Sequence, residues 1–265
     1  MRKFIRFLIG MMACAVLAYS SYQLYIFFTE TSASSRLNTS MVEEYVTVKP
    51  RPEAPAVPDQ TAEPGQTLPA ETQAPLETPP IEVDFAQLRQ QSGNVIGWLY
   101  CEDTPVNLPV AQSDDNAYYL RRLLDGTDNN AGTLFADYRN APDFSDRNTV
   151  IYGHNMKNKT MFGSIGDYRD QEYYDTHPVW WLLTENGNYK LELVAGYVTA
   201  STSEAYDHPD TDEEALDLAR LAVESSTFQT ALTLNPGDRY VTMSTCSYEF
   251  DNARYVLVAR LVPAA

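Results

Sequence analysis

The chain has 265 residues, of which 36 are acidic and 19 are basic, so its formal net charge is −17 at pH 7. Nonspecific binding to nucleic acid depends on lysine and arginine side chains that neutralise phosphates, and this charge therefore argues against a nucleic-acid partner. The chain contains only three cysteines. One of them lies in the first apolar segment, so no disulfide framework is evident.

The first predicted element is a membrane-spanning helix over residues 7–28. These 22 residues include no charged side chain, and at 1.5 Å per residue they reach about 33 Å, enough for a hydrocarbon core of about 30 Å. Basic residues precede the segment and Glu30 follows it, so the positive-inside bias predicts a single-pass protein of the cell membrane with residues 1–6 in the cytoplasm. A cleaved signal peptide is the alternative, because Ala13-Cys-Ala15 and Ala18-Tyr-Ser20 contain small residues. The apolar stretch is longer than a usual signal-peptide core, which favours the retained anchor.

Residues 29–80 are predicted to form an extracytoplasmic linker. Nine of the 16 prolines lie between Pro50 and Pro80, a composition typical of an extended, semi-rigid spacer. The pattern changes at Ile81. Residues 81–265 are predicted to form one folded domain, which is long enough to bury a single core.

Short apolar or alternating runs separated by Pro, Gly, Asn and Asp predict a β-barrel or sandwich in this domain. The predicted strands cover residues 95–100, 106–111, 132–136, 149–152, 190–199, 240–245 and 255–262. Helical patterns cover residues 84–91, 116–124, 161–168 and 211–225. Asp84 is a plausible N-cap, and Thr211 with Glu214 has the spacing of a capping box. The fold class is therefore mainly β with peripheral helices.

Three side chains suggest cysteine chemistry. If the last two predicted strands form a hairpin across residues 247–253, Cys246 at the end of one strand faces Arg254 at the start of the next. His154 follows another predicted strand, where a side chain can reach the rim of a sheet. Nucleophilic thiol chemistry needs a sulfur that ionises, a proton carrier and a donor for developing oxyanion charge. Each requirement has a candidate here.

The other cysteine and histidine residues have simpler interpretations. Cys101 lies in a predicted buried strand, so we expect two free thiols in the domain rather than a Cys101–Cys246 bridge. His177 and His208 both precede proline and are predicted to be turn residues. The histidines lack the ligand spacing of a zinc site, and neither a metal nor a cofactor is predicted.

Alternation along the strand before Cys246 predicts which side chains share its face. Ser244 and Cys246 lie on one face, together with Tyr240 and Thr242, while Val241 and Met243 point toward the core.

The combination of motifs resembles the sortases, most closely class B, from about residue 81 to residue 262. Five blocks carry the resemblance: Thr242-Met-Ser-Thr-Cys246 with the later Arg254, Tyr152-Gly-His-Asn-Met156, Met161-Phe-Gly163, Gly132-Thr-Leu-Phe-Ala-Asp-Tyr-Arg139 and Asp115-Asn-Ala-Tyr-Tyr-Leu120. The resemblance implies an eight-stranded β-barrel with added helices, including a long one between the sixth and seventh strands. Met243 replaces the usual leucine, a small change. Ser247 stands where some class B members carry an acidic residue.

The resemblance also implies a cysteine transpeptidase of Gram-positive cell envelopes. Cys246 would attack the carbonyl after a threonine in a sorting signal, His154 would protonate the departing amine, and Arg254 would stabilise the carbonyl oxygen. An amine of a peptidoglycan precursor, the lipid II peptide, would then release the acyl group from the thioester. The implied partners are surface proteins that bear a sorting signal. Substrate-lining candidates are Ser244, Tyr152 and Asn116, for which ordinary structural roles are equally consistent with the sequence.

Three alternatives stay open at this point. A pilin-polymerising sortase would use the same residues with a lysine acceptor. A cysteine endopeptidase would release its acyl group to water, although papain-like enzymes place cysteine before histidine, the reverse of His154 and Cys246. A membrane-tethered binding protein without activity would keep Cys246 as a buried strand residue.

Overall fold

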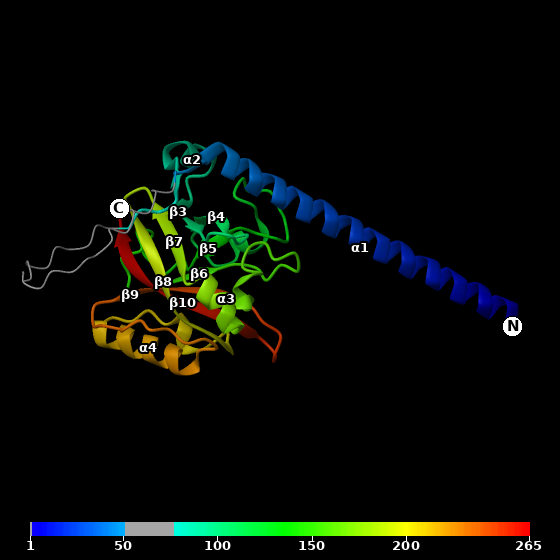
Figure 1. Ribbon diagram of the computed structural model, residues 1–265. Helices are drawn as coiled ribbons and strands as arrows, with labels where there is room; N and C mark the ends of the chain where they lie inside the picture. Colours follow the sequence, from blue (N-terminus) through cyan, green and yellow to red (C-terminus); the bar gives the residue numbers. More distant parts are fainter. Residues whose placement is uncertain (1, 51–76) are drawn as a thin grey trace, which may run out of the picture.

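The computed structural model describes residues 2–50 and 77–265 and begins with one very long helix. Helix α1 runs from Arg2 to Tyr45, 44 residues, and is long and apolar enough to be a candidate membrane span. Figure 1 shows it leaving the folded domain as a single rod. The helix does not end near residue 28, so residues 29–45 are helical rather than extended linker. This stretch contains neither proline nor glycine, and it packs on the domain through residues such as Met41 and Tyr45. The predicted proline-rich spacer falls mainly on residues 51–76, outside the described residues.

A small antiparallel sheet joins the end of α1 to the domain. Strand β1, Val46–Val48, pairs with β2, Ile81–Val83, so that Val46 faces Val83. Neither strand was predicted from the sequence, because each has only three residues. Their pairing places residues 46–48 and residues 81–83, on either side of the proline-rich stretch, next to each other.

Eight further strands close into a barrel, which confirms the predicted fold class. They are β3 Val95–Tyr100, β4 Asn107–Ala111, β5 Leu134–Ala136, β6 Asn148–Tyr152, β7 Val179–Thr184, β8 Gly187–Ala200, β9 Arg239–Cys246 and β10 Ala253–Ala264. Their order around the barrel is β10-β8-β7-β3-β4-β5-β6-β9, and the contact between β9 and β10 closes it. Strand β7 was missed, because its run of Val, Trp and Leu is apolar on both faces and shows no alternation.

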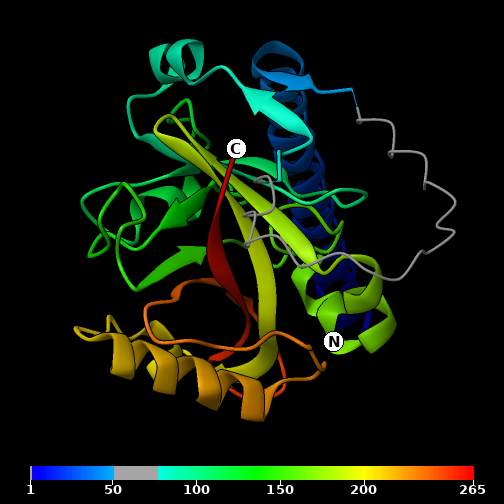
Figure 2. The same ribbon diagram turned by 60° about the vertical axis from the view of Figure 1, so that its left-hand side comes forward.

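The helices cover the outside of the barrel. Helix α2, Phe85–Gln91, is capped by Asp84, and helix α4, Asp212–Ser225, begins with the predicted capping box of Thr211 and Glu214. Helix α4 lies between β8 and β9, the sixth and seventh barrel strands, as expected, and Figure 2 shows it crossing beneath the barrel. A short helix α3, Gln171–Thr176, was not predicted.

Two of the predicted helices are shorter than expected. Residues 116–124 form only a 3-10 turn, η1, at Tyr118–Arg121, and residues 161–168 form only η2 at Ile165–Arg169. A third turn, η3, covers Glu204–Tyr206. Two of these turns lie beside the site described next.

Candidate active site

Three adjacent strands bring the predicted site residues to one rim of the barrel. Strands β6 and β9 are parallel and pair Tyr152 with Ser244, and His154 and Cys246 each lie two residues beyond that pair. Strand β10 is antiparallel to β9 and pairs Arg254 directly with Cys246. The predicted cross-strand relation between the cysteine and the arginine is therefore confirmed. Cys246 lies between the histidine segment and the arginine.

All six predicted site residues line one open cavity of about 340 Å³. Those residues are Asn116, Tyr152, His154, Ser244, Cys246 and Arg254. The remaining lining residues are Leu120, Phe135, Arg139, Gly153, Ser201, Tyr206 and Thr245. This second group was not predicted, although all of its members except Ser201 and Tyr206 lie within the sequence blocks that carry the family resemblance.

Hydrogen bonds fix the histidine segment against the cysteine strand. The Thr245 hydroxyl donates to the Gly153 carbonyl at 2.7 Å, and the Asn155 amide donates to the Cys246 carbonyl at 2.8 Å. Gly153 has no room for a side chain, because a Cβ would come within 2.4 Å of a Leu134 methyl carbon. The segment after β6 can therefore pass close to its neighbours and place His154 on the rim.

The His154 ring is held by a backbone group. Its Nε2 donates to the carbonyl oxygen of Leu120 at 2.7 Å. Within the described part of the chain no hydrogen bond joins His154 to Cys246, and Nδ1 is left as the ring nitrogen available for proton exchange. A backbone carbonyl thus does the orienting that a carboxylate does in other nucleophile–base–orienter arrangements.

The three cysteines are free and differ in exposure. Cys246 is half-buried, whereas Cys101 is buried in the barrel core, where burial raises the pKa of its thiol to about 11. The prediction of two free thiols in the domain is confirmed, and the alternative Cys101–Cys246 bridge is wrong. Thiolate chemistry is thereby limited to Cys246 among the domain cysteines.

Beside the cavity lies a carboxylate, that of Asp137, which accepts several hydrogen bonds and was not predicted from the sequence as a site residue. Asp137 is fully buried and accepts hydrogen bonds from Arg139 through Nε at 2.9 Å and Nη2 at 2.8 Å. Tyr152 donates its hydroxyl to Asp137 at 2.9 Å, and Asn116 donates its amide at 3.0 Å. Burial opposes ionisation of Asp137, but these bonds outweigh it and hold the pKa of Asp137 well below its usual range.

The three substrate-lining candidates therefore already have partners for their polar atoms. Tyr152 and Asn116 are bound to Asp137, and the Ser244 hydroxyl lies 2.8 Å from that of Tyr206. The ring of Tyr152 contacts those of Phe135 and Tyr206, with centroid distances of 5.3 Å and 6.1 Å. The three rings give this side of the cavity an aromatic wall.

We expect Asp137→Asn to lower the free energy of unfolding at pH 7 by about 2 kcal/mol, because it weakens charge-assisted bonds to Arg139 and to buried donors. The folded-state pKa of Asp137 is depressed, so its stabilising contribution is present at neutral pH and disappears as the pH falls from about 5 toward 2. Urea unfolding across that range should therefore show a shallower acid loss for the variant. The exposed Asp114→Asn is the control, and an equal loss in both variants would contradict this assignment.

Ser247, which stands where some class B sortases carry an acidic residue, has a carboxylate close by. Its hydroxyl donates to Glu249, and Arg169 donates to both Ser247 at 2.8 Å and Glu249 at 2.7 Å. The cluster ties the loop that follows Cys246 to η2. An acidic side chain is thus present near this position, two residues later in the chain.

The other two histidines do not line the cavity. His208 contacts the Asn140 side chain through Nδ1 at 3.1 Å, and its burial lowers its pKa. His177 follows α3 and stacks on Tyr173. Within residues 2–50 and 77–265, no cluster of three His, Cys, Asp or Glu side chains is arranged to hold a metal ion.

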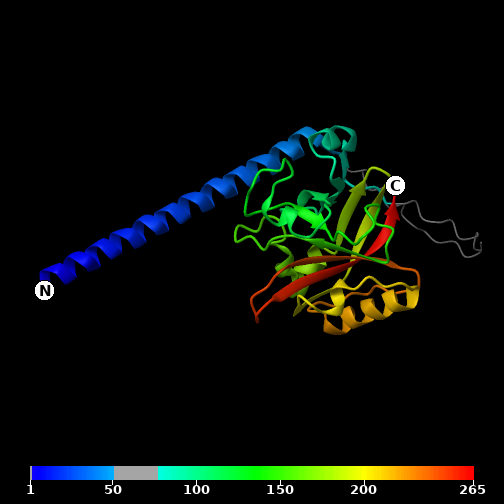
Figure 3. The ribbon, with the colours of Figure 1, turned by 180° about the vertical axis from the view of Figure 1, so that it is seen from behind.

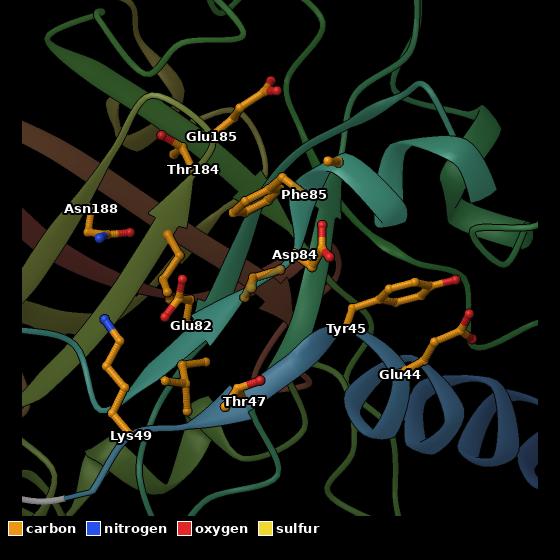
Figure 4. Close-up of a pocket in the computed structure, with 14 residues that line it drawn as sticks. Glu44, Tyr45, Thr47, Lys49, Glu82, Asp84, Phe85, Thr184, Glu185 and Asn188 are labelled. Atoms are coloured by element: carbon orange, nitrogen blue, oxygen red, sulfur yellow. The ribbon is translucent and has the colours of Figure 1, made fainter.

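A larger cavity of about 690 Å³ lies where α1 ends, around β1, β2 and the turn between β7 and β8 (Figure 4). It shares no lining residue with the site of Cys246. Its charged lining is mostly acidic, with Glu44, Glu82, Asp84 and Glu185 beside Lys49, and it contains neither cysteine nor histidine. It offers no nucleophile comparable to Cys246.

Comparisons with known proteins agree with this geometry. The family model for the sortase domain matches residues 99–262. Sortase B of Listeria monocytogenes is 33% identical over 185 residues, which cover 68% of this chain and 74% of the relative. A solved structure of sortase B from Bacillus anthracis in complex with AAEK1 aligns with a TM-score of 0.62 at 36% identity, covering 68% of this chain and 84% of that one. The Staphylococcus aureus sortase B–substrate complex aligns with a TM-score of 0.65 at 26% identity and covers 68% and 85%.

The barrel, the rim that carries His154, Cys246 and Arg254, and the matched family model lead to one assignment. The chain belongs to the sortase family as a class B sortase, a cysteine transpeptidase.

Proposed function

We propose that the chain is a membrane-anchored transpeptidase that cleaves a C-terminal sorting signal after threonine and transfers the protein to an amine of the peptidoglycan precursor. The observation that carries this proposal is the register of three strands, which aligns His154, Cys246 and Arg254 on one cavity. The alternative of a binding protein with a buried Cys246 is disfavoured, because the thiol is half-buried and lines that cavity.

The positions of the three side chains on one cavity support the following reaction. The Cys246 thiolate attacks the carbonyl carbon after threonine, and the Arg254 guanidinium donates hydrogen bonds to the oxyanion that forms. As the C–N bond breaks, His154 gives a proton to the departing amine through Nδ1, and a thioester remains on Cys246. A second amine then attacks the thioester and loses its proton to His154. An amide forms and the thiolate leaves, which restores the starting state.

The peptide is expected to lie along the aromatic wall of the cavity. The hydroxyls of Ser244 and Tyr152 and the amide of Asn116 have protein partners, so we propose that these residues shape the groove and contact the peptide through their apolar surfaces. Arg139 donates to Asp137 through Nε and Nη2 and also lines the cavity, so we propose that its remaining N–H groups donate to the peptide. Direct polar recognition would therefore come mainly from the two arginines.

Helix α1 supports a proposal for the location of the enzyme. We propose that residues 7–28 cross the cell membrane once, with residues 1–6 in the cytoplasm and the catalytic domain, residues 81–265, outside. The partners are then surface proteins with a sorting signal and the lipid II peptide of a Gram-positive envelope. A solved sortase B structure in complex with triglycine supports an amine acceptor of this kind. No cofactor takes part in these steps.

The test is to incubate the full chain in detergent with pentapeptides that end in Thr-Gly or Thr-Asn, with and without an amine acceptor, and to identify products by mass spectrometry. We expect cleavage after threonine, with the product changing from acid to amide when triglycine is added. Cleavage that is indifferent to amine would indicate an endopeptidase, and transfer only to a lysine-bearing peptide would indicate a pilin-polymerising enzyme. No product and no adduct with any peptide would contradict the proposal.

A further inference from the structure

The part of α1 next to the proposed membrane span is packed on the domain. We call residues 30–45 the juxtamembrane segment. Ser34, Met41 and Tyr45 are only 4%, 3% and 7% exposed, and their spacing of seven and four residues places them on one face of the helix. Thr39 and Glu43, on the other side, are exposed. This segment is therefore a docked element and not a solvated tether.

Its first partner is the loop that follows η1. The Asn129 amide donates to the Glu30 carbonyl at 2.9 Å, and the Asn130 amide donates to the Glu30 carboxylate at 2.6 Å. Met41 and Tyr45 also belong to one buried cluster with Tyr119, a residue of η1. The helix thus bonds to one end of a short stretch, residues 119–130, and shares a buried cluster with its other end.

That stretch contains the backbone group that orients the catalytic histidine. The Leu120 carbonyl accepts the hydrogen bond from His154 Nε2 at 2.7 Å. The Thr133 amide donates to the Tyr119 carbonyl at 3.1 Å, and Gly132 approaches so closely that a Cβ would lie 2.4 Å from the same oxygen. Because the backbone around η1 is tightly packed, movement of residues 119–130 would also move the Leu120 carbonyl.

The second partner is the loop that follows His154. The Asn38 amide lies 4.0 Å from the sulfur of Met161, a weak N–H···S contact. Met161 is 2% exposed and has φ of +54°, a left-handed conformation that a non-glycine residue keeps only when its surroundings enforce it. Met161 bridges to Asn155, and the Phe162 amide donates to the His154 carbonyl at 3.1 Å. The helix therefore contacts the loops on both sides of the histidine.

We propose that the juxtamembrane segment is a positioning element for His154, acting through the Leu120 carbonyl on one side and the Met161 loop on the other. This inference rests on the proposed function only in taking His154 as the proton carrier. Figures 1 and 3, which view the molecule from opposite sides, both place the β9–β10 hairpin on the side of the domain toward which α1 extends. The same docking thus sets the catalytic rim toward the membrane, where a lipid-linked amine would be found.

The experiment uses the full chain in detergent with Met41→Ala, the conservative rescue Met41→Leu, and Thr39→Ala as the exposed control on the same helix. Amide hydrogen exchange reports whether the loops at residues 118–133 and 155–162 loosen. The pH profile of Cys246 alkylation by iodoacetamide, read by peptide mass spectrometry, reports on the histidine beside it. Neither measurement needs a sorting peptide, so failure to find a substrate would not affect this test.

For Met41→Ala we expect exchange at residues 118–133 to quicken at least about tenfold, because the truncated side chain belongs to the buried cluster that contains Tyr119. The alkylation profile should shift, and with a cleaved peptide kcat should fall about tenfold while KM changes less than about twofold. Met41→Leu and Thr39→Ala should resemble the wild type. If Met41→Ala unfolds, the half-buried Asn38→Ala is used instead, with the same expectation for residues 155–162.

Two results would overturn the proposal. Loops that exchange faster while the alkylation profile and kcat stay unchanged would show that the segment only stabilises the domain. Loop exchange that is unaffected by Met41→Ala or Asn38→Ala would show that the helix does not hold these loops.

Discussion

Replacing Cys246 by alanine is expected to abolish thioester formation and peptide turnover altogether, because no other thiol of the domain can take its place. Cys246 is half-buried and lines the cavity with His154 and Arg254. In the proposed mechanism the sulfur is the atom that bonds to the acyl carbon, so its removal eliminates the first covalent step and does not merely weaken binding. Intact-protein mass spectrometry should show an acyl adduct on the wild type and none on the variant.

The matched control is Cys101→Ala. Cys101 is 1% exposed, and burial raises the pKa of its thiol to about 11, so it should neither form the adduct nor react quickly with iodoacetamide at pH 7. This variant should keep its activity. Turnover that survives Cys246→Ala but is lost in Cys101→Ala would show that the nucleophile has been misassigned.

Arg254→Lys is expected to reduce kcat by about 100-fold to 1,000-fold, the usual effect of losing one oxyanion donor. Arg254 pairs directly with Cys246 across β9 and β10, and its Nη1 donates to the Ala253 carbonyl at 2.9 Å, which fixes the direction of its planar fork. Lysine keeps the positive charge but lacks that fork, so it cannot hold the Ala253 carbonyl and the oxyanion together in the same way. The measurement is kcat and KM on a cleaved peptide.

Arg260→Lys is the control for this prediction, since Arg260 lies on the same strand. Arg260 binds Glu192 at the far end of β10 and does not line the cavity of Cys246. Its replacement should leave kcat within about twofold of the wild type. A kcat for Arg254→Lys that falls equally close to the wild type would contradict the oxyanion role.

Local patterns were sufficient for several elements of this protein. The capping residues Asp84 and Thr211 mark helix starts that the structure reproduces, because capping depends on side chains within three residues of the helix end. Alternation along β9 correctly placed Val241 and Met243 in the core. The facing of Cys246 and Arg254 was also readable, because a short hairpin loop fixes the register of its two strands.

Other elements could not be read locally. Strand β7 shows no alternation of apolar and polar residues, because both of its faces are packed against apolar clusters. Trp180 and Leu182 lie in the barrel core, whereas Leu183 lies in a second buried cluster. The helical continuation of α1 beyond residue 28 has a mostly polar sequence. Which of its faces is buried can be recognised only when the loops that it contacts are known. The predicted helix over residues 116–124 shortens to a 3-10 turn, whose Tyr119 and Arg121 carbonyls accept hydrogen bonds from residues 133 and 129.

The three side chains of the proposed chemistry were predicted from the sequence alone: Cys246 at a strand end, His154 after another strand and Arg254 opening the next. How these groups are held became clear from the packing of distant parts of the chain. The parallel pairing of β6 with β9 joins residues more than 90 positions apart, and it brings His154 beside Cys246. The buried carboxylate of Asp137 and the Leu120 carbonyl at His154 became visible for the same reason. Contacts of this kind depend on long-range packing and register, which no local periodicity encodes.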